Sequence, residues 1–388
     1  AFFDTGVNSF TGVSIWIEAH NQNDAEGAPA RDETAVARFG ELTAAFTLQL
    51  LLPLLVILLA FPAFSGEREV GTLRQVLSMG VRPRDLLFGK ALGATQALAL
   101  FLGPILLIGL VGLVLLPGGA AFLPHGLLLV LVYSVYALIF LFLTLAVSAA
   151  SGSSKTTLVI MVGVWAVSSF VLPRIAADTS QVLYPTPSSY EFEQAIANDL
   201  ENGLDGVSPA AVIRQRQEQT LALYNVESLD ELPINFQGII FDIQEDLGDQ
   251  VFDKHYGALH ETFEKQTGVF SFFSLFSPRL AVQLASMELS GTSLLHHLRF
   301  SRAAESYRRE LIDQMNQAIT FNSAGNQTDY RAGPELWEDV EPFEYEIPPL
   351  SESAAELGPS GIVMFLWLTF SIVAGIVAVD RLRFMSGA

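Results

Sequence analysis

Residues 64–90 read FSGEREVGTLRQVLSMGVRPRDLLFGK, a charged amphipathic stretch that lies between two long apolar runs. Each flanking run is long enough to cross a bilayer as a helix, which takes about 20 apolar residues. Residues 65–90 therefore form a connector between two spans. A chain that only reverses direction needs no basic helix interrupted by glycine, so we expect this connector to dock on a protein in the cytosol.

The composition of the whole chain agrees with a membrane protein. Of 388 residues, 51% are hydrophobic and 16% are charged, and the mean hydropathy is +0.40, which is too apolar for an ordinary soluble domain. Five runs have the character of a span: residues 42–64, 91–116, 127–149, 157–173 and 359–379. The sequence predicts an all-α membrane protein with five visible transmembrane helices and a helical extracytoplasmic domain.

Basic residues in the short loops set the orientation of the spans. They gather in the connector, at Lys155, and at Arg381 and Arg383, so these segments face the cytosol, whereas residues 177–358 are dominated by Asp and Glu. We expect a multi-pass protein of the bacterial inner membrane with its large acidic domain on the periplasmic side. The predicted segments are 1–41 outside, 42–176 with four spans, 177–358 as the acidic helical domain, and 359–388 as the last span and cytosolic tail.

The number and orientation of the spans place residues 1–41 outside the membrane, with no span before them in the sequence. The chain opens on Ala1, and it shows neither the basic start nor the apolar core of a signal peptide. We therefore expect one more span upstream, which makes six in the parent protein.

Charge and cysteine content exclude several classes of function. A net charge of −20 argues against binding to nucleic acid or to anionic headgroups, and the absence of cysteine excludes disulfides and thiolate metal sites. His296 and His297 are adjacent and point to different sides of a helix, and solvated helix faces account for them and for His255 and His260. We predict no metal site, no catalytic residue and no cofactor in this chain, because it has no nucleophile motif and no complete phosphate loop.

The membrane runs contain few polar residues. No Asp, Glu, Lys, Arg or His occurs in the runs 42–64, 91–116, 127–149 and 359–379, which disfavours an ion-coupled transporter, because such proteins need ionisable groups inside the membrane. Gln49, Gln96 and Tyr133 are candidates for a substrate surface, and the alternative for each is a hydrogen bond between helices.

The acidic domain is predicted to be helical. Apolar residues recur at steps of three and four over residues 236–263 and 294–319, which predicts two long amphipathic helices that pair antiparallel. Between them a further helix starts at Ser277-Pro278 and stops at Gly291. Four aromatic residues precede it: Phe270, Phe272, Phe273 and Phe276. They form either a core or interface cluster or a landing surface for an apolar substrate.

Two motifs in the connector, Ser65-Gly-Glu-Arg-Glu-Val-Gly-Thr-Leu73 and the later Gly89-Lys90, resemble the connector after the second span in permease subunits of type-2 ABC transporters. Residues 277–309 are similar to a subgroup with a large extracytoplasmic insert before the last span. The resemblance implies that the amphipathic helix couples the spans to an ATPase subunit, which binds ATP and Mg²⁺. The implied coupling residues are Glu67, Arg68, Gly71, Thr72, Leu73, Arg74 and Leu77. A helix here places Leu73, Val76 and Leu77 on one side and Glu67, Arg68, Arg74 and Gln75 on the other.

The leading hypothesis is a permease subunit of an ATP-driven ABC transporter, which works as a pair of permeases with two separate ATPase subunits. The second permease is expected to be a related chain rather than an identical one, with membrane lipids and a periplasmic protein as further partners. Spans almost free of charge favour export or extraction of a hydrophobic or amphipathic substrate, since apolar walls cannot replace the water around a charged solute. The alternative is a non-transporting scaffold that recruits envelope proteins through its extracytoplasmic domain. A channel is disfavoured, because the spans show no pore-lining pattern of charges or carbonyls.

Overall fold

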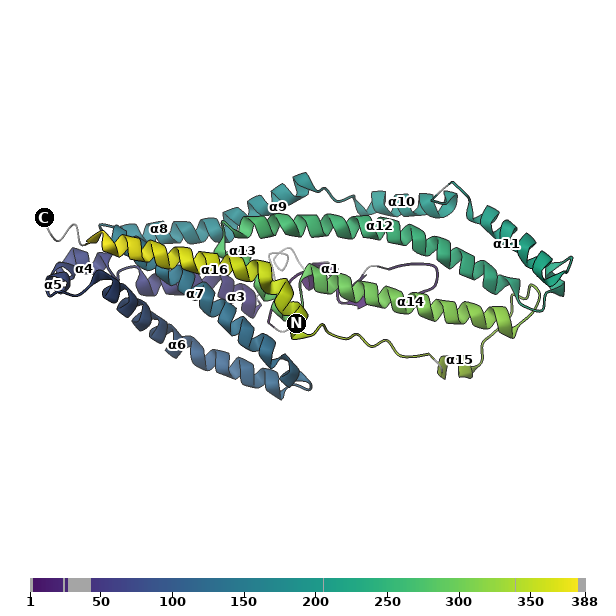
Figure 1. Cartoon of the computed structure of the whole chain (residues 1–388), viewed down its shortest axis with the longest axis horizontal. Helices are drawn as coiled ribbons and strands as arrows, with labels where there is room; N and C mark the ends of the chain where they lie inside the picture. Colours follow the sequence, from purple (N-terminus) through teal and green to yellow (C-terminus); the bar gives the residue numbers. More distant parts are fainter. Residues whose placement is uncertain (1–2, 24, 27–42, 205, 339, 383–388) are drawn as a thin grey trace.

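The structure, a computed structural model, describes residues 3–23, 25–26, 43–204, 206–338 and 340–382. Residues 27–42, where the predicted outer segment ends and the first run begins, and Arg383 lie outside the described residues. The molecule is elongated: apolar helices form a bundle at one end, and long polar helices extend from it toward the other (Figure 1).

Five helices in the described part of the chain are long and apolar enough to cross a membrane. They are α3 (Ala44–Ala60), α6 (Pro83–Leu115), α7 (Leu123–Ala150), α8 (Ser154–Ala166) with its continuation, and α16 (Leu350–Asp380). The prediction of an all-α, multi-pass membrane protein is confirmed.

Two spans continue past the predicted domain boundaries. α8 continues through a π-helical segment (Val167–Val171) into α9 (Leu172–Leu183), and α16 begins nine residues before the predicted run at residue 359. The predicted boundaries at 176/177 and 358/359 therefore fall inside continuous helices.

α7 lies at the centre of the bundle, which we call the membrane domain. It packs against α3, α6 and α16, and its side chains of Tyr136, Phe140 and Leu145 are almost fully buried. α6 follows a different pattern: its buried residues are confined to its first half, and most of its apolar side chains are exposed. Most of the surface of α6 is therefore available for lipid or for another protein.

The polar end of the molecule, which we call the helical domain, contains α10 (Ser189–Asn202), α11 (Pro209–Tyr224), α12 (Phe236–Ser274), α14 (Leu294–Asn322) and the short α15 (Pro334–Glu338). As predicted, α12 and α14 pack side by side along their length (Figure 1). Arg308 of α14 is 2% exposed and contacts three carboxylates: Glu245 at 2.9 Å, Asp249 at 2.5 Å and Glu305 at 2.9 Å. Because removing one partner of a buried ion pair leaves an uncompensated charge, this cluster fixes the pairing of the two helices.

α12 continues beyond the predicted end of its apolar stripe and enters the membrane domain. Trp367 Nε1 donates to the carbonyl of Ser274 at 3.1 Å, and Ser277 Oγ donates to the carbonyl of Ser168 at 2.9 Å. Trp367 lies 13 residues before the end of α16, and Ser168 lies 14 residues after the start of α8, which is about 20 Å along either helix. In a hydrocarbon layer of about 30 Å, the turn after α12 thus lies at the depth of the spans.

The chain returns from this depth through α13 (Pro278–Ser290), which packs against α7, α16 and α3. Its start and its stop at Gly291 are as predicted, and Gly291 has a φ of 67°. Residues 274–290, which the sequence assigns to the domain outside the membrane, therefore form a hairpin with the end of α12 that is inserted among the spans.

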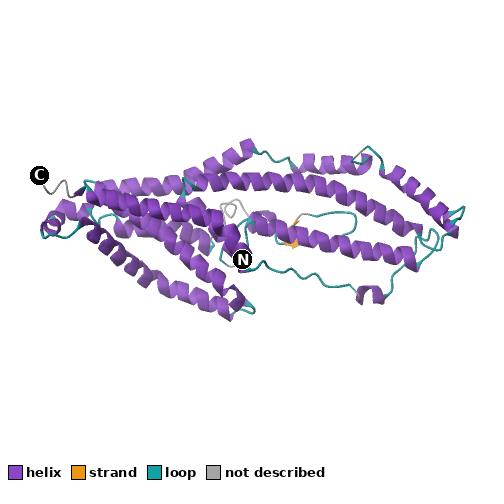
Figure 2. Ribbon diagram, viewed as in Figure 1, coloured by secondary structure: helices purple, strands orange, loops and turns teal. Residues whose placement is uncertain are grey.

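The N-terminal residues cover the base of the helical domain. They form α1 (Asn8–Thr11) and the small sheet of β1 (Ser14–Ile15) and β2 (Ala25–Glu26), drawn in orange in Figure 2. Ala45 N donates to the carbonyl of Phe3 at 3.1 Å, and Val7 N donates to the carbonyl of Thr292 at 3.0 Å. These bonds join the segment to α3 and to the exit of the inserted hairpin.

Candidate functional site

The connector between the first two described spans is a pair of short helices. α4 (Ser65–Val70) ends at Gly71, which has a φ of 86°, and α5 (Thr72–Ser78) follows directly. The left-handed backbone conformation costs little energy for glycine and much more for other residues. Gly71 therefore sets the angle between the two helices. Thr72 Oγ1 donates back to the carbonyl of Glu67 at 3.3 Å and helps to hold that angle.

Two adjacent charged residues fasten α4 to the ends of neighbouring helices. Arg68 donates to the carbonyl of Ala149 at 2.7 Å and to that of Ser151, at the C-terminal end of α7. Glu69 accepts from the backbone N–H of Ser154 at 3.0 Å, at the N-terminal end of α8. Each charge complements the helix end that it contacts, because helix C-termini attract cations and helix N-termini attract anions.

Glu67 is also directed inward. Its carboxylate lies 2.6 Å from Lys90 Nζ at the start of the next span, and that ammonium stands 5.2 Å from the ring of Phe64. The expectation that Glu67 and Arg68 lie on the free face of the connector is therefore wrong: both side chains bind neighbouring spans, because unpaired helix ends and a lysine lie within their reach. Their role in coupling to an ATPase remains a prediction.

The remaining connector residues divide as predicted into an anchored side and a free side. Leu73 is 4% exposed and belongs to the apolar core with the half-buried Leu77. Arg74 and Gln75 are exposed, and so are Val70 and Met79, which are 79% and 74% exposed. The connector thus presents one apolar and basic face away from the chain while its other side is fixed to the spans.

A second polar group of residues lies buried inside the membrane domain. Gln49 Nε2 donates to Tyr133 OH at 3.2 Å, Tyr133 OH donates to Ser286 Oγ at 3.1 Å, and Ser286 Oγ donates to Asp4 at 2.5 Å. Tyr136 OH donates to the backbone carbonyl of Gln49 at 2.9 Å. The structure thus brings together two predicted substrate-surface residues, Gln49 and Tyr133, but inside a closed network rather than on a surface.

Two of the backbone carbonyls that accept hydrogen bonds in this region are free because a proline follows four residues later. Proline has no N–H, so the carbonyl four residues earlier loses its helical partner. Pro53 releases the carbonyl of Gln49, which Tyr136 takes, and Pro173 releases the carbonyl of Ser169, to which Arg279 Nη1 donates at 2.7 Å. In the π-helical segment, Leu172 N donates to Val167 instead of Ser168, which leaves the Ser168 carbonyl for Ser277.

Arg279 is the functional candidate that sequence reasoning missed. Its side chain lies in α13, is 9% exposed, and has a buried Nε without a hydrogen-bond partner. Neither Arg279 nor Asp4 belongs to an apolar run, so the count of charges in the runs overlooked both. Pro173, four residues after Ser169, is the signal in the sequence that could have pointed to a free carbonyl.

The other candidate substrate residues lie apart from this network. Gln96 is exposed on α6. The ring of Phe272 contacts those of Phe273 and Phe276 at centroid distances of 5.7 and 5.6 Å. Phe272 and Phe276 are exposed, whereas Phe270 and Phe273 are half-buried. Because this cluster lies at the inserted turn, its exposed rings lie at the depth of the spans.

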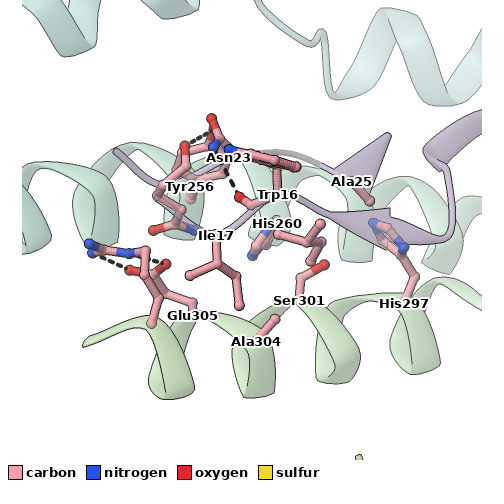
Figure 3. Close-up of a pocket in the computed structure, with 13 residues that line it drawn as sticks. Trp16, Ile17, Asn23, Ala25, Tyr256, His260, His297, Ser301, Ala304 and Glu305 are labelled. Atoms are coloured by element: carbon pink, nitrogen blue, oxygen red, sulfur yellow. Dashed lines mark hydrogen bonds and ion pairs between the residues drawn. The ribbon is translucent and has the colours of Figure 1, made fainter. Parts of the chain in front are cut away.

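Two cavities lie in the helical domain. The larger, of about 500 Å³, lies between α10, α11 and α12 and has mostly aliphatic walls, from residues that include Leu200, Leu204, Val212, Leu247 and Val251. The smaller, of about 40 Å³, lies between the N-terminal sheet and α14, with Trp16, Tyr256 and Ser301 among its lining (Figure 3). The first has room for a hydrocarbon chain, whereas the second holds only a few water molecules.

The sequence suggested that the histidines lie on solvated helix faces, but some of them do not. His255 Nε2 lies 2.8 Å from Asp199, and Lys254 with His255 holds the pKa of that carboxyl below its usual range. Burial lowers the pKa of His260 to about 4. His296 is 6% exposed and lies beside two carboxylates. That reading is wrong for His255, which is covered by Asp199 and Phe192 of α10, and for His296, which lies beside Glu288 of α13 and Glu356 of α16.

Comparison with known proteins gives one match. A family described as a domain of unknown function (DUF3526) matches residues 202–346, which cover α11, α12, α13, α14 and α15. No curated protein matches the chain, and no solved structure matches it.

Proposed function

We propose that this chain is the permease subunit of an ATP-driven transporter of the type-2 ABC class, located in the bacterial inner membrane. The connector is the observation that carries the proposal. It is bonded to the ends of α7 and α8 through Arg68 and Glu69 and to Lys90 of α6 through Glu67, and it exposes Val70, Arg74 and Met79. A rigid element with a free docking face suits transmission of movement from a motor protein to several spans at once.

The second part of the proposal is a hydrophobic or amphipathic cargo. Exposed rings at the inserted turn and the aliphatic cavity between α10, α11 and α12 support it, because burial of a hydrocarbon chain gains about 0.8 kcal/mol per CH₂. Cargo would leave the bilayer beside Phe272 and Phe276 and be held in the helical domain. The large exposed surface of α6 suits a second permease, which completes a pathway that a single half does not enclose.

The test is coupled ATP hydrolysis in nanodiscs that contain this chain and its ATPase partner. Val70→Glu with Arg74→Glu changes only the free face, so we expect the ATPase to dissociate and hydrolysis to fall to background. Leu223→Glu is the matched control, because Leu223 is 78% exposed on α11, far along the chain from the connector. Leu73→Ala should keep the ATPase bound but lose stimulation by lipids or apolar peptides.

Two results would contradict the proposal. Full association and turnover in the double variant would exclude the connector as the docking face. Normal assembly with envelope proteins, together with no substrate movement under any nucleotide condition, would favour the scaffold function instead.

A further inference from the structure

Three side chains from three different helices meet where the helical domain joins the membrane domain. Glu288 lies in the last turn of α13, His296 in the first turn of α14, and Glu356 near the start of α16. One donor atom from each lies within 4.8 Å of the other two. They converge here because Gly291 reverses the chain between Glu288 and His296, and α16 returns beside α13.

The donors of this cluster are buried and partly without partners. His296 is 6% exposed, and its Nδ1 lies 3.5 Å from Glu288 Oε2. Glu288 Oε2 and Glu356 Oε2 are buried and accept no hydrogen bond. Buried carboxylate oxygens are normally hydrogen-bonded or bind a cation, so two such oxygens beside a buried imidazole indicate a missing positive partner.

The cationic side chains around this cluster are fewer than the carboxylates. Arg299 is bonded to the other oxygen of Glu356, Oε1, and its Nη1 lies 3.7 Å from Glu352. One guanidinium therefore faces three carboxylates, those of Glu288, Glu352 and Glu356. A divalent cation would place positive charge beside the unpartnered oxygens of Glu288 and Glu356.

We propose that Glu288, His296 and Glu356 bind one divalent transition-metal ion of the zinc type. One imidazole nitrogen with two carboxylate oxygens is a donor set that suits Zn²⁺, whereas Ca²⁺ and Mg²⁺ prefer oxygen ligands alone. Tetrahedral coordination at 2.0–2.1 Å separates donors by about 3.4 Å, a small contraction from the present spacing. Ser293 Oγ, 2.9 Å from His296 Nδ1, is the group that the ion would displace.

Such an ion would join the inserted hairpin, the first turn of α14 and the last span at one point. This inference does not depend on the proposed transport function, because it concerns only the assembly of the chain itself. It gives the helical domain a fixed attachment to α16 on the side where the N-terminal segment also binds.

The experiment is calorimetric titration of the full chain in nanodiscs with ZnCl₂, after treatment with a chelator. We expect one Zn²⁺ per chain, and His296→Gln and Glu356→Gln should each weaken binding by about tenfold or more. Glu352→Gln is the matched control, since Glu352 lies one turn earlier on α16 and also faces Arg299 but is not one of the three donors; it should bind as wild type. Unchanged affinity in His296→Gln and Glu356→Gln would overturn the proposal.

A second measurement uses only the wild-type protein, so misfolding of a variant cannot affect it. Zinc-edge X-ray absorption of the wild-type complex should show a single imidazole among nitrogen and oxygen ligands. A spectrum without imidazole, one with two or more imidazoles, or displacement of Zn²⁺ by an equal concentration of Ca²⁺ or Mg²⁺ would each refute this assignment.

Discussion

At the scale of single residues, the membrane domain depends on carbonyls that prolines release. Arg279 and Tyr136 each donate to a carbonyl four residues before a proline, Pro173 and Pro53 respectively. A guanidinium at the depth of the spans is costly unless its hydrogen bonds are made. The free carbonyl of Ser169 therefore decides whether α13 can be buried among the spans.

Replacing Pro173 by Ala should weaken the attachment of the inserted hairpin. The new N–H can compete with Arg279 for the carbonyl of Ser169 and weaken that bond. The expected loss is at most about 1.5–3 kcal/mol, the worth of a hydrogen bond to a charged group, and the gain in helix propensity offsets part of it. Thermal unfolding in detergent measures it. Pro104→Ala is the control, because Pro104 lies exposed in α6; that change should be neutral or stabilising. Equal effects of the two changes would contradict this account.

The positions of some connector side chains could be predicted from the sequence, and those of others could not. The connector pattern placed Leu73 on the anchored side and Arg74 on the free side correctly, because helical periodicity alone decides that division. It could not place Glu67 or Arg68, since their partners, Lys90 and the end of α7, come together only in the folded chain. The environment of His296 was hidden for the same reason.

At the scale of elements, the pairing of α12 with α14 depends on one close approach. A Cβ at Gly238 would lie 2.0 Å from Thr320 Oγ1 and 2.7 Å from the carbonyl of Asn316. No shift of a flexible side chain relieves a contact with backbone, so the two helices approach as closely as they do only because residue 238 is glycine.

Gly238→Ala should therefore destabilise the helical domain by about 1–3 kcal/mol through overpacking. Gly257→Ala on the same helix meets nothing within 4 Å, and alanine's higher helix propensity should stabilise it by about 0.5–1 kcal/mol. Thermal unfolding of both variants, followed by circular dichroism, gives the comparison. Effects of the same sign would mean that helix propensity, not the crossing, governs residue 238.

The start and end of α13 were predictable, but its location was not. Ser277-Pro278 and Gly291 are local signals of a helix start and stop, and the structure confirms both. The location follows from the free carbonyls of the π-helical segment (Val167–Val171) and from packing of α13 against α7 and α16, which no local pattern encodes. The length of α12 was underestimated, because residues 269–274 continue the helix into the aromatic cluster without a breaker before Pro278.

At the scale of the whole molecule, the inserted turn joins two regions that the sequence treats as separate. Because the chain contains no cysteine, a single one can be introduced and spin-labelled. A nitroxide at Phe272→Cys should be more accessible to oxygen than to a water-soluble nickel reagent, since the ring lies at the depth of the spans.

The control label is Leu223→Cys, on the exposed side of α11, which should show the reverse preference. Equal access of the nickel reagent to both labels would place the α12–α13 turn in water. That outcome would contradict insertion, although the helix bounds would stand.

The continuity of α12 has a mechanical consequence. Its 39 residues form one helix of about 58 Å, with one end clamped among the spans by Ser274 and Ser277 and the other at the far end of the molecule (Figure 1). A tilt of about 5° at the clamped end would displace the opposite end by about 5 Å for a rod of that length. The helix is thus a lever, and small rearrangements in the bilayer would be amplified into ångström-scale strokes at its tip.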